Sequence, residues 1–397
     1  MSLNETASAN RLHIGFFGRR NSGKSSLINA FTGQQVSIVS DVAGTTTDPV
    51  TKAMEVRGIG ACTLIDTAGF DDVEELGLQR VEKTQKAAEK ADIAVMVTTG
   101  TDTSFEKKWT EHFKEKRTPV LGVLNKAETL QNPVEMAQQL EKELGIKVIT
   151  VSAARGEGIE RLRDELLHLV PEDFGIRSIT RDLCKEDDVV LLVMPQDIQA
   201  PKGRLIMPQV QTIRELLDKK CTVISTTADK IDNALGALKE PPSLIITDSQ
   251  VFGLVYQKKP DSSRLTSFSV LFAALKGDID YYLEGASAIE SLTEKSRVLI
   301  AECCTHAPTT EDIGRVKIPA LLRKRIGQGL TVEFSNGTDF PTDLTPYDLI
   351  IQCGACMFNR KYVMSRVERA MTAKVPMTNY GVAIAYLNDI LDKITVK

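Results

Sequence analysis

Residues 18–25 read Gly18-Arg19-Arg20-Asn21-Ser22-Gly23-Lys24-Ser25, which is the pattern G-x-x-x-x-G-K-S of a phosphate-binding loop. An apolar segment precedes it and an amphipathic segment follows it. This order predicts a strand, a loop and a helix, whose backbone N–H groups and positive dipole end favour an anion. The Lys24 ammonium is placed to bind the β- and γ-phosphates, and the Ser25 hydroxyl to bind Mg²⁺. The predicted phosphate contacts are Asn21, Ser22, Gly23, Lys24, Ser25, Ser26 and, further along, Gly69.

The bulk composition bounds the remaining possibilities. A chain of 397 residues is too long for one hydrophobic core, so two or three domains are expected. The formal net charge of −4 counts against nucleic acid as a stable partner. No apolar run approaches the roughly 20 residues of a membrane span, and residues 1–10 lack the basic-then-apolar order of a signal peptide. We therefore expect a cytoplasmic protein without a membrane partner, and a short disordered lead-in at 1–10.

Elements that sense the γ-phosphate follow the phosphate loop in the order found in GTPases. A polar loop contains Thr46, whose hydroxyl can complete the Mg²⁺ shell, with Thr47 as the alternative. An apolar strand then leads into Asp66, which is placed to hold Mg²⁺ largely through water. The N–H group of Gly69 is placed to contact the γ-phosphate. The predicted Mg²⁺ set is therefore Ser25, Thr46 and Asp66.

Two further apolar runs, 93–97 and 120–124, suit buried parallel strands. The second ends in Asn125-Lys126-Ala127-Glu128, which is similar to the N-K-x-D element of guanine-binding proteins. A carboxylate in its last position accepts hydrogen bonds from guanine N1 and N2, and Glu128 keeps that chemistry one methylene further out. A last strand at 148–151 runs into a Ser-Ala loop that faces the guanine O6. The predicted guanine contacts are Asn125, Lys126, Glu128, Ser152 and Ala153.

Two details narrow the class of GTPase. Phe70 follows Gly69 where Ras-like enzymes have a water-positioning glutamine, so hydrolysis of GTP to GDP must use another group. Asn21 inside the phosphate loop, together with Gly44-Thr45-Thr46-Thr47-Asp48, resembles the TrmE–Era branch of GTPases. In cation-activated members of that branch, the equivalent asparagine helps to bind K⁺, which supplies the positive charge of an arginine finger. The resemblance implies a Mg²⁺-dependent, K⁺-activated GTPase with Asn21 at the K⁺ site.

The same resemblance offers a group that orients the attacking water. The segment 74–80 is similar to the TrmE segment that carries a water-orienting glutamate, and Glu74 occupies that position. The alternative is a solvated acidic loop, which charge runs usually are. Glu74 is therefore the candidate catalytic residue, and both interpretations stay open.

A strand–helix alternation continues beyond the first 172 residues. Residues 171–175 break the helical pattern and predict a linker after a GTPase domain at 11–172. The order of apolar and amphipathic runs predicts a small α/β domain at 180–262, for structure or dimerisation, with a plain spacer as the alternative. The alternation resumes at 263–397. The fold prediction is a Ras-like P-loop GTPase domain of the α/β class, followed by two smaller α/β domains with mainly parallel sheets.

Four of the seven cysteines lie in the last quarter of the chain, whereas Cys62, Cys184 and Cys221 are isolated and suit buried core thiols. Strand-like runs end at Cys303-Cys304-Thr305-His306 and at Cys353-Gly354-Ala355-Cys356. In a parallel sheet such ends share one edge. The spacing fits an iron–sulfur cluster, a zinc site built from Cys304, His306, Cys353 and Cys356, or core thiols. Cys303 is left out, because it would point away from the motif if its strand continued through it.

A TrmE–Era-like GTPase joined to a C-terminal C-x-H … C-x-x-C domain resembles the HydF family, the maturation GTPases of FeFe-hydrogenases, over essentially the whole chain. The resemblance implies a 4Fe–4S cluster on Cys304, Cys353 and Cys356, within a cluster-binding domain at 263–397. It also implies a homodimer or higher oligomer that receives a transient di-iron subcluster from radical-SAM maturases and delivers it to apo-FeFe-hydrogenase. The family usually has histidine where this chain has Gln352, so the fourth ligand is His306, another residue or an exchangeable group.

Two other functions stay open at this point. RNA modification or ribosome assembly is the commonest occupation of the TrmE–Era branch, although the acidic composition counts against RNA binding. A redox switch would instead use Cys353 and Cys356 as a reversible disulfide.

Overall fold

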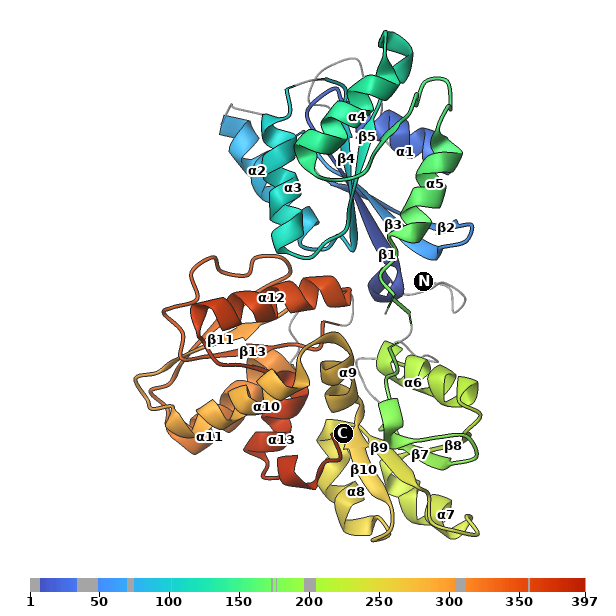
Figure 1. The fold of residues 1–397 in the computed structure, drawn as a ribbon. Coiled ribbons are helices and arrows are strands. Elements are labelled where there is room, and N and C mark those ends of the chain that lie inside the picture. The colour runs from blue at the N-terminus through green and yellow to red at the C-terminus, as the bar shows by residue number, and fades with distance from the viewer. Residues whose placement is uncertain are drawn as a thin grey trace. The chain divides into compact units, whose positions relative to one another are not determined.

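The computed structural model describes residues 8–33, 49–69, 75–100, 102–172, 174–175, 177–195, 205–303, 312–355 and 358–396, without the side chains of 75–81. The chain divides into two compact units, Met1–Ile176 and Arg177–Lys397 (Figure 1). None of the described helices combines the length and the apolar character needed to span a bilayer.

The first unit is built on a six-stranded sheet in the order β2-β3-β1-β4-β5-β6. Its strands are β1 (Leu12–Phe17), β2 (Val50–Val56), β3 (Gly60–Asp66), β4 (Ile93–Thr98), β5 (Val120–Leu124) and β6 (Val148–Thr150). The β2–β3 pairing is antiparallel and the others are parallel. Helices α1 (Lys24–Thr32) and α5 (Ile159–His168) cover one face, and α2 (Glu75–Ala88), α3 (Ser104–Glu115) and α4 (Pro133–Leu144) cover the other (Figure 1). This is the predicted Ras-like P-loop fold.

Burial of this sheet explains where its functional loops emerge. Strands β1 and β4 are buried along their whole length, as expected for parallel strands covered by helices on both faces. Because β1, β3, β5 and β6 run in the same direction, the segments that follow them leave from one edge of the sheet. The phosphate loop, Asp66, Asn125 and Ser152 all lie in those segments.

The second unit begins with a parallel four-stranded sheet in the order β10-β9-β7-β8. Its elements are β7 (Val189–Val193), α6 (Met207–Asp218), β8 (Thr222–Thr226), α7 (Ile231–Gly236), β9 (Leu244–Thr247), α8 (Phe252–Lys258), β10 (Arg264–Ser267) and α9 (Phe268–Lys276). Strand β10 lies beyond residue 262, the predicted end of the middle domain, and still belongs to this sheet. Strand β10 is too short and too polar to be assigned to this sheet from its own residues.

A second parallel sheet, in the order β12-β11-β13-β14, completes the second unit. Its elements are α10 (Ile279–Ser287), β11 (Arg297–Ala301), α11 (Ile318–Ile326), β12 (Thr331–Ser335), β13 (Leu349–Gln352), α12 (Arg360–Ala373), β14 (Met377–Asn379) and α13 (Tyr380–Leu387). Leu191 and Ile245 of the first sheet belong to the same buried cluster as Leu299 and Ile350 of the second. The two sheets therefore share a hydrophobic core.

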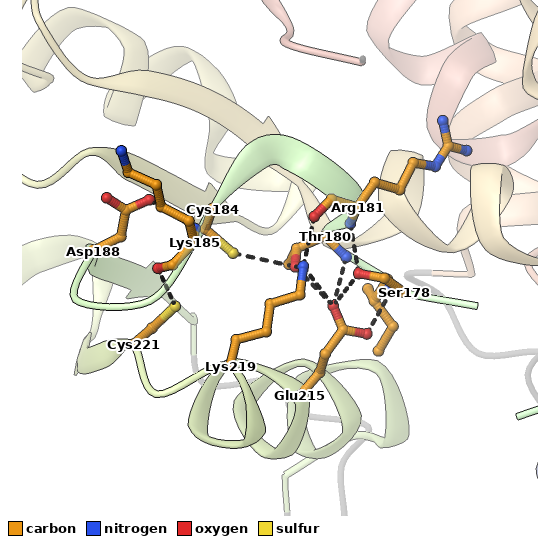
Figure 2. A network of polar contacts seen from close by, with 10 residues as sticks. Ser178, Thr180, Arg181, Cys184, Lys185, Asp188, Glu215, Lys219 and Cys221 are labelled. Carbon is orange, nitrogen blue, oxygen red and sulfur yellow. Dashed lines mark hydrogen bonds and ion pairs between the residues drawn. The ribbon is translucent and has the colours of Figure 1, made fainter. Parts of the chain in front are cut away.

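A carboxylate fastens the first residues of the second unit to α6 (Figure 2). Glu215 Oε1 accepts hydrogen bonds from Ser178 Oγ at 2.8 Å, Thr180 N at 2.8 Å and Thr180 Oγ1 at 2.7 Å. Its Oε2 accepts from Ile179 N at 2.5 Å. Lys219 Nζ, one turn further along α6, donates to Thr180 Oγ1 at 2.9 Å. One side chain thus holds three successive residues at the start of the unit.

The isolated cysteines are buried thiols, as predicted from sequence. Cys184 and Cys221 flank the Glu215 network, where their thiols donate to Thr180 Oγ1 and to the Lys185 carbonyl, each at 3.2 Å (Figure 2). Burial raises the pKa of Cys221 to about 11. A raised pKa favours the protonated thiol, which is unreactive.

Replacing Glu215 with glutamine is expected to loosen this attachment. The new amide NH₂ would face N–H donors, and a hydrogen bond to a charged group contributes about 2 kcal/mol, so amide exchange at Ile179 and Thr180 should accelerate by about 30-fold. Hydrogen exchange measures this directly. Asp218→Asn, which alters an exposed carboxylate on the same helix, is the matched control. Equal exchange rates in the two variants would contradict the role of Glu215.

Candidate functional site

The phosphate loop joins the buried strand β1 to helix α1 through a tightly curled backbone. Asn21 and Gly23 both occupy the left-handed region, at φ 58° and 85°. A Cβ on Gly23 would lie 2.3 Å from Asn125 Nδ2, and a Cβ on Gly18 would lie 2.2 Å from the Val97 carbonyl oxygen. Both glycines are therefore required by close approach of neighbouring atoms. The curl directs the loop toward the first turn of α1, a favourable position for phosphate.

Two of the predicted Mg²⁺ residues lie together. Ser25 Oγ donates to Asp66 Oδ2 at 2.6 Å, which joins the start of α1 to the end of β3. Lys24 is buried, and its Nζ donates to the carbonyl oxygens of Gly18 and Arg19 at 2.9 and 2.8 Å. The ammonium is therefore held inside the curl of the loop. Thr46 and its alternative Thr47 lie outside the described residues, as does Glu74.

The amide of Asn125 connects the phosphate loop to the predicted guanine-binding segments. Its side chain follows β5 and is 1% exposed. The Nδ2 atom donates to the carbonyl oxygens of Ser22 at 3.0 Å and Gly23 at 3.4 Å, and Oδ1 accepts from Ala153 N at 3.2 Å. One side chain thus positions three segments that are far apart in the sequence.

The remaining predicted guanine residues gather beside Asn125. Lys126 has a left-handed backbone at φ 57° and an exposed side chain, and Glu128 lies in the short 3₁₀ turn Ala127–Thr129 that follows. A hydrogen bond with the Ser152 side chain is the main cause that lowers the pKa of Glu128. The structure therefore brings a carboxylate, an ammonium and the 152–153 loop to one place.

The other predicted phosphate contacts are also at this edge of the sheet. A Cβ on Gly69 would lie 2.6 Å from the backbone nitrogen of Arg20, so Gly69 packs directly on the phosphate loop. Asn21 is exposed at the tip of the loop, and Ser26 is half-buried in the first turn of α1. The side chain of Asn21 is thus accessible from solvent.

Ion pairs of Arg19 connect the phosphate loop to α3 and to the residues just before it, and no sequence motif indicates them. Arg19 Nη1 lies 2.8 Å from Asp102 Oδ2, and its Nε lies 3.3 Å from Glu106 Oε1. Glu106 is fully buried, and this burial raises its pKa, although the neighbouring Arg19 opposes the shift. The sequence feature that could have indicated this contact is the spacing of Glu106, which places a carboxylate on the same helix face as the apolar Trp109 and Phe113.

The cysteines of the second unit lie at the carboxyl edge of its second sheet. Strands β11 and β13 are parallel neighbours, so Cys303 and Cys353 follow strand ends at the same edge, as predicted. The Cys353 Sγ accepts hydrogen bonds from Cys303 N at 3.0 Å and from Ala355 N at 3.4 Å. Chiefly because of its hydrogen bond with the Cys303 thiol, the pKa of Cys353 falls to about 6. A sulfur that accepts two backbone N–H groups fits an iron ligand.

Cys303 faces Cys353, which differs from the direction expected for a continuing strand. Strand β11 ends at Ala301, so the alternation that would turn Cys303 away from the motif does not continue through it. Its side chain is 2% exposed and belongs to the same small apolar cluster as Cys353 and Tyr362. Cys303 is therefore part of the cysteine site, as a neighbour of Cys353.

Gln352 is fully buried, and neither its Oε1 nor its Nε2 has a hydrogen-bond partner among the described residues. A buried polar atom without a hydrogen bond lowers the stability of the folded state, so the amide of Gln352 is destabilising where it lies. Cys304, His306 and Cys356 lie outside the described residues. Within the described part of the chain, no three His, Cys, Asp or Glu side chains are grouped to hold a metal ion.

Comparison with known proteins identifies the architecture. Residues 179–277 match the hydrogen maturase F dimerization domain, and residues 280–396 match the hydrogen maturase F tetramerization domain. The chain belongs to the HydF family. Together these two models span more than half of it, and both HydF descriptions support the predicted oligomer. Residues 13–126 match the model of a 50S ribosome-binding GTPase, so the first unit of this HydF-family chain is a GTPase domain.

The chain spans less than two thirds of the length of the curated relatives that it matches. GTPase Der from Natranaerobius thermophilus is 32% identical over 272 residues, which cover 66% of this chain and 57% of Der. The tRNA modification GTPase MnmE from Paraburkholderia xenovorans is 33% identical over 173 residues, which cover 42% of this chain and 36% of MnmE. A crystal structure of Era in complex with MgGDPNP and a 16S ribosomal RNA segment covers 55% of this chain and 92% of Era, at 20% identity and a TM-score of 0.38.

Proposed function

We propose that this chain is a GTP-hydrolysing scaffold that binds a 4Fe–4S cluster and delivers the di-iron subcluster during FeFe-hydrogenase maturation. The observation that carries the proposal is the presence, on one HydF-family chain, of a phosphate loop held by Asn125 and of a cysteine at a strand end whose sulfur accepts backbone N–H groups. The proposed partners are radical-SAM maturases, which supply the subcluster, and apo-FeFe-hydrogenase, which receives it.

At the nucleotide site, the proposed reaction is attack of water on the γ-phosphate of GTP, which releases GDP and phosphate. Lys24 neutralises developing charge on the phosphates, and Ser25 and Asp66 hold Mg²⁺ together with Thr46. The contact between Ser25 and Asp66 supports this set. Asn125 and Glu128 select guanine beside Ser152, and Glu74 orients the attacking water.

Potassium is the proposed activator, with Asn21 as a ligand. GTP turnover in potassium buffer is therefore expected to exceed turnover in sodium buffer by at least about tenfold, because a cation beside the phosphates supplies the charge of an arginine finger. Release of phosphate measures the rates. Asn21→Gly removes the proposed ligand and keeps a residue that tolerates the left-handed backbone at φ 58°, so this variant should lose the potassium activation. Equal rates in the two buffers would rule out this role.

At the cysteine site, Cys304, Cys353 and Cys356 are proposed to hold the cluster, with His306 or an exchangeable group as the fourth ligand. The hydrogen bonds from Cys303 N and Ala355 N to Cys353 Sγ support this assignment, because ligand sulfurs in such sites accept backbone N–H groups. A bound cluster would supply an iron–sulfur surface on which a further metal group can be presented.

Anaerobic reconstitution tests the function. The full chain, incubated with iron and sulfide and then reduced, is expected to bind about four irons and to give an electron paramagnetic resonance signal of a reduced 4Fe–4S cluster. Cys304→Ser should lose this signal, whereas Cys221→Ser, a buried thiol of the other sheet, should keep it. Absence of the signal in the unsubstituted protein would overturn the proposal.

A second candidate is an RNA-directed GTPase, which the similarity to MnmE and the ribosome-binding GTPase model favour. This function predicts tRNA or rRNA binding that weakens steeply as salt rises, because phosphate contacts release counterions. Binding that is absent at low salt excludes it.

A further inference from the structure

A fully buried arginine lies beside the cysteine site. Arg366 is on α12, is 0% exposed and is the largest completely buried side chain of the described residues. Its Nη1 donates to Cys303 Sγ at 3.1 Å, and its Nη2 donates to the Gly337 carbonyl oxygen at 2.6 Å and to Tyr362 Oη at 2.9 Å. The guanidinium is thus aimed at the sulfur next to Cys353.

Two aromatic rings hold the guanidinium in that position. The Cζ atom of Arg366 lies 4.8 Å from the ring centroid of Phe340 and 4.8 Å from that of Tyr362. Such contacts favour a cation over an uncharged group of the same size. The side chain is therefore built in as a charge and fixed in direction.

The charge of Arg366 has no carboxylate partner in the described part of the chain: the hydrogen bonds recorded for it go to a thiol, a carbonyl and a phenol. An uncompensated cation in the interior is unfavourable. Burial alone would lower the pKa of Arg366, and the charges of neighbouring groups, Cys303 foremost, raise it overall. The interior site is thus suited to negative charge on sulfur.

A second buried cation supports the same segment. Lys276, at the end of α9, is 5% exposed, and its Nζ donates to the carbonyl oxygens of Ala355 and Phe358 at 2.8 and 3.1 Å. These two carbonyls bracket the position of Cys356 in the sequence. Positive charge therefore reaches the cysteine segment from two helices, α9 and α12.

We propose that Arg366 is the buried counter-charge of the iron–sulfur site and helps to set the reduction potential of its cluster, an inference that rests on the proposed function. A thiolate-bound cluster becomes more negative when it is reduced, so a fixed cation stabilises the reduced form more than the oxidised form. The cation reaches the site through Cys303, whose sulfur accepts from Arg366 and whose N–H donates to Cys353 Sγ. Arg366 is a positioning residue rather than a ligand.

The test is a redox titration, followed by electron paramagnetic resonance, of the reconstituted full chain. Arg366→Gln removes the charge and should make reduction less favourable by about tenfold, which is a potential about 59 mV lower for one electron. Arg366→Lys keeps a basic group, and at a pH low enough for a buried lysine to stay protonated it should remain within about threefold of the unsubstituted protein. Arg369→Gln is the matched control, because Arg369 lies on the same helix, stacks on the same Phe340 ring at 4.9 Å and donates through Nη2 to the Pro341 carbonyl oxygen.

The outcomes separate this inference from the proposed function. Failure of the unsubstituted protein to bind a cluster would overturn the function itself. A cluster with the same potential in the unsubstituted protein and in Arg366→Gln would overturn the role of Arg366 alone. If Arg366→Gln does not fold, as judged by circular dichroism, the lysine variant decides at a low pH that keeps the lysine protonated. A potential near the original then supports the counter-charge, and a tenfold shift contradicts it.

Discussion

Replacing Asn125 with alanine is expected to weaken GTP binding by about 100-fold. The substitution removes three hydrogen bonds that join the carbonyl groups of Ser22 and Gly23 to the backbone N–H of Ala153. Each neutral hydrogen bond contributes about 1 kcal/mol, and about 1.4 kcal/mol corresponds to tenfold in affinity. Titration calorimetry with GTP measures the loss. The effect combines loss of the proposed guanine contact with loss of the hydrogen bonds that hold the phosphate loop.

The aspartate variant tests whether the donor of Asn125 matters. Asn125→Asp keeps the acceptor for Ala153 N but turns a carboxylate oxygen toward the carbonyl oxygens of Ser22 and Gly23, so it should bind GTP at least as poorly as the alanine variant. Asn132→Asp, an exposed position near the start of α4, should leave affinity unchanged. If Asn125→Asp binds GTP as tightly as the unsubstituted protein, the hydrogen bonds from Asn125 Nδ2 to the phosphate loop do not support GTP binding.

The gathering of the phosphate loop, Asp66 and Asn125 at one sheet edge could be predicted because it follows from local sequence patterns. Glycine positions set the curl of the phosphate loop, and apolar runs that end in Asp66 and Asn125 mark strand ends at one sheet edge. The tie between Asn125 and the phosphate loop was not predictable, because it joins residues about 100 positions apart and depends on which strands are neighbours. The contact between Arg19 and Glu106 could not be predicted for the same reason, because these residues are also far apart in the sequence.

The cysteine site shows a different limit. The sequence correctly indicates that Cys303 and Cys353 follow parallel strands, because both strands are short and apolar. Which way Cys303 faces depends on whether β11 ends at Ala301 or continues through Cys303, because the alternation of side chains holds only while the strand continues. The pairing with β12 and β13 decides that end, and those strands lie more than 30 residues further along the chain. The role of Arg366 depends on the same folded arrangement.

Replacing Cys353 with serine is expected to reduce bound iron after anaerobic reconstitution from about four per chain to less than one, because an alkoxide is rarely available to replace a thiolate ligand. Cys303→Ala provides the sharp comparison, since the two thiols are neighbours and their replacement disturbs the same core cluster. It should retain iron, because Cys303 Sγ is engaged by Arg366 and its contribution to Cys353 comes from the backbone N–H, which alanine keeps.

Iron and sulfide analysis of both variants then distinguishes a ligand from its neighbour. Loss of iron in Cys353→Ser together with retention in Cys303→Ala places the metal on Cys353. Equal loss in both would make Cys303 a ligand, and the hydrogen bond from Arg366 would then act directly on a cluster sulfur. Equal retention in both would remove Cys353 from the ligand set. Its low pKa would then reflect the two backbone N–H groups and the neighbouring thiol that surround it.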